Sequence, residues 1–72
     1  MHNGSPLPGD IVVHRHVHSP AVYVVSGFHG SLQFSYDAYG EALSNAIHLA
    51  RTGNLDVWYT TDELLYEGVA SY

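Results

Sequence analysis

Three histidines, His14, His16 and His18, alternate with other residues near the start of the chain. Side chains two apart on a strand share one face at ~6.6 Å, so two imidazoles at that spacing can converge on one Zn²⁺. The first and third lie ~13 Å apart on a straight strand, too far for all three to reach one ion. We therefore take His16 and His18 as a candidate zinc pair, which needs a carboxylate or His29 as a further ligand. The alternative is a histidine-rich strand that faces solvent or a partner.

No other pattern in the sequence indicates a reaction. Serine and threonine are present, but none lies in a nucleophile elbow or beside a recognisable base. The Gly27–Gly30 segment resembles a phosphate loop only superficially, because it leads into a predicted strand and lacks the lysine. Cysteine is absent, which excludes disulfides and thiolate metal sites. We expect a noncatalytic protein with no cofactor other than the zinc ion considered above.

A small sheet and one helix are the elements that would position these histidines. Apolar residues recur with helical spacing between Asp37, the predicted N-cap, and Gly53, the predicted left-handed residue after the last turn. Elsewhere they alternate, which predicts strands at residues 11–18, 21–26, 31–36, 55–60 and 64–72. The predicted fold class is α+β, a mostly antiparallel sheet with one amphipathic helix on one face, in the order βββαββ. Residues 1–8 are predicted to be a flexible N-terminal arm and residues 9–72 a single domain.

The turn of the first hairpin decides which way the histidines face. A two-residue turn at Ser19 and Pro20 would point all three into the core, where unpaired imidazoles are costly. A three-residue loop at residues 18–20 instead turns Ile11, Val13 and Val17 inward and the histidines outward, because a shift of one residue exchanges the two faces. We adopt the three-residue loop.

The second hairpin is predicted to have a four-residue loop at Gly27–Gly30. That loop places Tyr23 and Val25 beside Leu32 and Phe34, on the face that forms the core.

The outward face of this predicted sheet is only partly polar. Trp58 joins it if Val57 points to the helix; the alternative is that Trp58 is in the core and Val57 is not. The predicted interaction face consists of Val12, His14, His16, His18, Val22, Val24 and Trp58. An open apolar face and the thin core of a 72-residue domain both favour association. We therefore expect a protein-interaction module that forms a homodimer through this face, and the alternative is the histidine-based metal-binding protein described above.

Charge is unevenly distributed along the chain, whose formal net charge is −5. All of the seven acidic residues except Asp10 lie in the second half. With two arginines and no lysine, the chain can neutralise few phosphates, so we expect no nucleic-acid binding. No run approaches the ~18 apolar residues of a membrane span, and the start has no signal-peptide pattern. We expect a soluble cytoplasmic protein without a membrane partner.

The segment Glu41–Ala46, with strands before and after it, resembles the helix of small HicB-like antitoxin domains and of uncharacterised bacterial families that combine a sheet with a helix. The resemblance rests on the amphipathic pattern and carries over no site residues. It implies a further alternative, an antitoxin-like regulator that binds a basic partner protein through the acidic second half.

Overall fold

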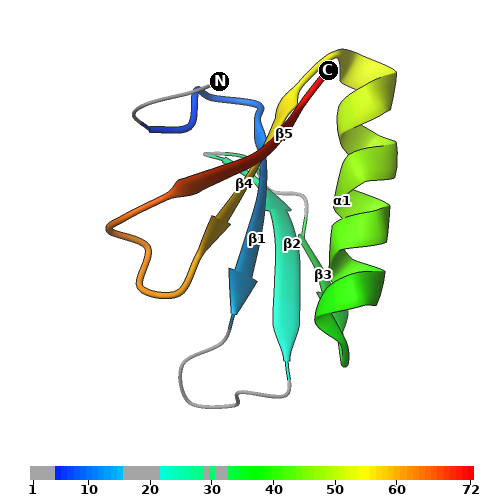
Figure 1. The fold of residues 1–72 in the computed structure, drawn as a ribbon, viewed down its shortest axis with the longest axis vertical. Coiled ribbons are helices and arrows are strands. Elements are labelled where there is room, and N and C mark those ends of the chain that lie inside the picture. The colour runs from blue at the N-terminus through cyan, green and yellow to red at the C-terminus, as the bar shows by residue number, and fades with distance from the viewer. Residues whose placement is uncertain (1–4, 16–21, 29, 31–32) are drawn as a thin grey trace.

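In the part of the chain that the structure describes, the protein forms a five-stranded sheet with one helix across it (Figure 1). The computed structural model describes residues 5–15, 22–28, 30 and 33–72. The elements are β1 (Ile11–Arg15), β2 (Tyr23–Gly27), β3 (Gln33–Tyr36), α1 (Tyr39–Gly53), β4 (Asp56–Thr60) and β5 (Glu67–Ser71). The strand order is β3-β2-β1-β4-β5, and all neighbours are antiparallel except β1 and β4, which are parallel. The predicted α+β class and βββαββ order are confirmed.

The main core lies between α1 and one face of the sheet. Three alanines on the helix, Ala42, Ala46 and Ala50, are completely buried against it. The opposing sheet residues are Ile11, Val13, Val25 and Val57. Because alanine has only a methyl group, the helix can approach these branched side chains closely and leave little empty space.

Both helix ends differ by a residue from the sequence prediction. Ala38, not Asp37, is the N-cap, and it has no side-chain hydrogen bond to the helix. Gly53 is the last helical residue, and the left-handed residue is Asn54, with φ 53° and ψ 47°. Asparagine is the commonest residue after glycine at such a position, so the pair Gly53–Asn54 marks the helix end without fixing which of the two takes the left-handed conformation.

The first hairpin has the predicted facing. Val13 lies opposite Val25, and both are fully buried in the core under α1. His14, the next residue, therefore lies on the other face, as predicted. His16 and His18 lie outside the described residues.

The second hairpin is paired two residues further along than predicted. Val25 lies opposite Phe34, and Tyr23 opposite Tyr36. β3 accordingly begins only at Gln33. A shift of two residues keeps every side chain on the same face, which is why the predicted core face is still correct.

The outer face of the sheet, on the side away from α1, is not open, and this corrects the sequence prediction. Val57 does point to the helix and Trp58 away from it, yet Trp58 is only 2% exposed. Val12 and Val24 are 5% and 8% exposed, and Val22 is half-buried. The exposed apolar surface that motivated a homodimer through this face is therefore absent from these residues. Among the described residues, two irregular segments lie against this face: Asp10 of residues 5–10 bonds to Trp58, and Glu63 and Tyr66 of residues 61–66 line a cavity with Val12 and Val24.

Asp10 fastens the first of these segments to β4. Its Oδ2 accepts hydrogen bonds from the backbone N–H of Leu7 at 2.9 Å and from the indole N–H of Trp58 at 3.1 Å. Asp10 is 5% exposed, and Pro6 beside it is buried. These contacts concern residues 5–10, and the flexible arm predicted for residues 1–8 stays a prediction. In the described ranges, no helix is long and apolar enough to cross a bilayer.

Candidate functional site

The second covering segment is the turn between β4 and β5, and its own hydrogen bonds give it a defined shape. Thr60, 2% exposed at the end of β4, donates its hydroxyl to the carbonyl of Leu65 at 2.8 Å and accepts the N–H of Glu63 at 3.0 Å. The Asp62 carboxylate accepts the N–H groups of Leu64 and Leu65 at 2.9 and 3.0 Å. These backbone donors, Leu65 first, hold the pKa of Asp62 below its usual value.

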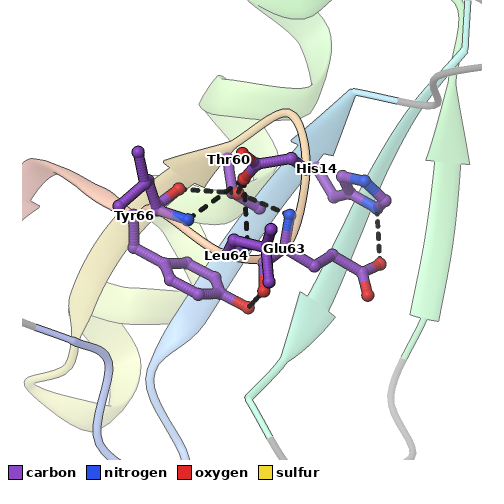
Figure 2. Close-up of polar contacts among 7 residues, drawn as sticks. His14, Thr60, Glu63, Leu64 and Tyr66 are labelled. Carbon is purple, nitrogen blue, oxygen red and sulfur yellow. Dashed lines mark hydrogen bonds and ion pairs between the residues drawn. The ribbon is translucent and has the colours of Figure 1, made fainter.

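Glu63 in this turn reaches back to His14 on β1 (Figure 2). Its backbone is left-handed, with φ 61°, which is uncommon for a residue other than glycine. The His14 Nδ1 and Glu63 Oε1 atoms are 3.1 Å apart. In the neutral ring Nδ1–H donates to the carboxylate, which leaves Nε2 as an acceptor. Nε2 is buried and has no hydrogen-bond partner in the part of the chain that the structure describes.

The turn and the outer face of the sheet line a cavity of about 350 Å³ that is open to solvent on one side. Its walls come from all of the strands except β5, together with residues after β2 and in the turn. They are Val12, His14, Val24, Ser26, Gly27, Phe28, Gln33, Thr60, Glu63 and Tyr66. The cavity therefore has an apolar floor of valines and a rim that carries one carboxylate.

Two aromatic rings meet at this cavity. Phe28 and Tyr66 pack edge to face, with ring centroids 5.8 Å apart. The Tyr66 hydroxyl donates to the carbonyl of Glu63 at 3.3 Å. Burial, and then the negative charges of Glu63 and Asp62, raise the pKa of Tyr66 above its ordinary value. The hydroxyl therefore stays protonated and keeps donating to the turn.

The structure brings only part of the predicted interaction face to this site. Val12, His14 and Val24 line the cavity, whereas Trp58 lies on the same face of the sheet but bonds to Asp10. Val22 is half-buried and is not among the cavity residues.

The candidate zinc pair, His16 and His18, which is also part of the predicted interaction face, lies outside the described residues. Among the residues that are described, no three histidine or acidic side chains are grouped so that they could hold a metal ion. The zinc site stays a prediction.

Sequence reasoning missed the residues of the turn and of the second hairpin that complete the cavity, Phe28, Thr60, Glu63 and Tyr66. The pattern Thr60-x-Asp62 before the Leu64–Leu65 pair was the available signal, because threonine and aspartate side chains favour hydrogen-bonded turns. Nothing local in the sequence showed that the turn folds back over β1.

Some large apolar side chains remain exposed. Leu64 and Leu65 at the tip of the turn are 79% and 80% exposed, and Phe34 on β3 is 44% exposed. The leucines have acidic neighbours, Asp62 and Glu63, whereas β3 contains no charged residue. Leu7 and Tyr72 are also exposed, at 67% and 41%, so the exposed apolar side chains of the described residues are spread over β3, the turn and the two terminal segments.

No protein-family model matches the chain, and neither a curated protein nor a solved structure matches it significantly.

Proposed function

We propose that the protein is a noncatalytic interaction module that associates with a second copy of itself through the outer edge of β3, which pairs with no further strand among the described residues. One observation carries this proposal: β3 lies at the end of the strand order, and its residues Gln33–Tyr36 are uncharged and mostly exposed. The unpaired N–H and C=O groups of an edge strand are a template for another strand, and monomeric proteins usually block such an edge with charges, proline or bulges. β3 has none of these.

The opposite edge of the sheet has the protection that β3 lacks. β5 carries Glu67 and Gly68, and its pairing with β4 is irregular between Val57 and Trp58. A charge and an irregular edge both disfavour pairing with another strand. The contrast between the two edges favours β3 as the interface.

A second copy is the occupant that the charges favour. Antiparallel pairing of two β3 strands about a twofold axis brings uncharged residues together. The acidic turn with Asp62 and Glu63 joins β4 to β5 and folds back over β1, where Glu63 contacts His14, so its carboxylates are not among the residues that would pair. Asp37 follows directly after β3 and would lie at the end of the paired segment. Because only four residues pair, we expect a weak dimer.

Thr60 supports the noncatalytic part of the proposal. Thr60 is a hydroxyl residue that lies beside His14 in the pairing of β1 with β4. It is 2% exposed and already donates to the carbonyl of Leu65. A hydroxyl held in this way is not available to attack a substrate.

The test is the oligomeric state of two lysine variants. Ser35→Lys puts a charge on β3, and Ser71→Lys puts the same charge on an exposed position of β5. In sedimentation equilibrium at about 100 µM, a concentration suited to weak contacts, the wild type and Ser71→Lys should dimerise and Ser35→Lys should be monomeric. A monomeric wild type, or equal dissociation of both variants, would overturn the proposal.

A second candidate function is capture of a basic partner protein by the turn. Leu64 and Leu65 are highly exposed on a turn held by Asp62, and Asp62, Glu63 and Glu67 surround them with negative charge. A rigid apolar tip with an acidic border complements an apolar pocket with a basic rim. An antitoxin-like regulator would bind its partner in this manner.

Affinity capture with a double variant tests this second function. Leu64→Ser combined with Leu65→Ser removes the apolar tip, and Leu7→Ser is the control, because Leu7 is 67% exposed elsewhere. A basic protein, identified and then purified, should bind the wild type and the control in a salt-sensitive manner, and should not bind the double variant. Equal binding to all three would reject this function.

A further inference from the structure

Among the described residues that line the cavity on the outer face, Glu63 is acidic and none is an arginine or a lysine. The chain has two arginines and no lysine, and neither arginine lines the cavity. Arg15 follows His14 on β1 and so points to the other face, and Arg51 lies over the ring of Tyr72 at 5.4 Å. Glu63 is the acidic residue at the rim, with its side chain 65% exposed. The cavity therefore disfavours an anionic ligand.

We infer that this cavity binds a small organic cation, a primary amine with an aromatic or aliphatic body. About 350 Å³ is at the lower end of the range for small-molecule sites. Val12 and Val24 form an apolar floor for the body of the ligand. Phe28 and Tyr66 supply aromatic rings for the ammonium, and the Glu63 carboxylate accepts its N–H groups.

The His14–Glu63 pair shows that the carboxylate is held at the rim. His14 Nδ1–H engages one Glu63 oxygen at 3.1 Å, which leaves the second oxygen for a ligand. Buried polar atoms without a partner are rare, and His14 Nε2 is one in the described part of the chain. An ammonium has three N–H groups, so it can bind the second Glu63 oxygen while His14 keeps the first.

Of the ten described residues that line this cavity, only Gln33 belongs to β3, so binding of an amine and self-association can fail independently. The cavity lies under the turn between β4 and β5, and its β3 wall is Gln33. Oligomeric state is therefore measured alongside ligand binding, but neither result decides the other.

The experiment compares three probes that differ in the charged group: 2-phenylethylamine, 2-phenylethanol and 3-phenylpropanoate. Calorimetry should give an affinity for the amine about tenfold above that for the alcohol, because the ammonium gains both cation–π and charge-assisted contacts. The anion should not bind. NMR shift changes should be centred on Val12, Val24 and Tyr66. Failure of the amine to bind, or an equal or higher affinity for the alcohol or the anion, would overturn the inference.

Two charge-matched variants locate the site. Glu63→Gln should weaken binding of the amine about tenfold, since a neutral amide is a poorer partner for ammonium. It should leave the affinity for the alcohol unchanged. Glu67→Gln removes the same charge from an exposed residue of β5 that does not line the cavity, and it should bind the amine as the wild type does. Urea unfolding of both variants checks that each is folded. If Glu63→Gln is unfolded, Phe28→Leu takes its place as the cavity variant. Equal weakening by the cavity variant and by Glu67→Gln would assign the effect to net charge and contradict the site.

Discussion

The side chain of Asp10 connects two parts of the outer face that are 48 residues apart in the sequence. Its carboxylate accepts the N–H of Leu7 and the indole N–H of Trp58, and Asp10 itself is 5% exposed. Removing a buried acceptor leaves these donors without it, which costs more than the hydrogen bonds contribute. Asp10 thus links the segment before β1 to β4.

Asp10→Ala should therefore lower the free energy of unfolding by about 2–3 kcal/mol, measured by urea denaturation. Asp10→Asn keeps an oxygen acceptor and should cost less. The control is Asp37→Ala, which should stay within about 0.5 kcal/mol of the wild type, because Asp37 is exposed and is not the N-cap. A larger loss for Asp37→Ala than for Asp10→Ala would contradict these assignments.

Asp62 should make the stability of the turn depend on pH. Backbone donors lower its pKa in the folded state, so folding is favoured most when the group is ionised. That contribution is present above the unfolded pKa, near 3.8, and is lost as the pH falls through the lower folded pKa. Asp62→Asn should be less stable than the wild type at neutral pH, and the difference in urea midpoint should shrink in acid. A difference that grows with acidity would contradict the assigned role.

At the scale of elements, the pairing of α1 with the sheet depends on small residues. Ala42, Ala46 and Ala50 are fully buried, and a larger side chain there must push the helix away from the sheet. Ala46→Leu should lower the free energy of unfolding by about 1–3 kcal/mol in thermal or urea unfolding. Ser44→Leu on the exposed part of the helix is the control and should have little effect. Equal effects would mean that the helix does not pack as described.

The sequence predicted these elements well, because helical spacing and alternation are local signals. The helix at residues 39–53 follows from periodicity, and the inward direction of Val13 follows from alternation together with the cost of burying the histidines. Two details were predicted wrongly: the left-handed residue at the helix end is Asn54 and not Gly53, and β3 pairs two residues further along. Both depend on turn conformations that several residue types can adopt. The burial of Trp58 was not predictable, since its partner Asp10 is 48 residues away in the sequence.

At the scale of the whole molecule, a small domain gains a second layer from irregular segments. The helix covers one face, while residues 5–10 and the turn between β4 and β5 cover much of the other (Figure 1). In a chain of 72 residues, apolar side chains are thereby buried on both faces of the sheet, and the faces have less need of a partner to cover them. What remains unprotected in the described part of the chain is an edge, which is why the proposed dimer continues the sheet instead of stacking it.

The most direct measurement of that dimer is a spin-label experiment, because the chain has no cysteine and a single introduced cysteine can be labelled specifically. A nitroxide label is attached to Ser35→Cys on β3 or, as the matched control, to Ser71→Cys on β5, and its electron paramagnetic resonance spectrum is recorded at the dimer concentration. Strands that pair lie ~4.8 Å apart, so two labels on adjoining β3 strands should broaden each other's spectra strongly. The β5 labels, at the opposite edges of the joined sheet, should give an unbroadened spectrum. Broadening at position 71 but not at position 35, or at neither position, would contradict association through β3.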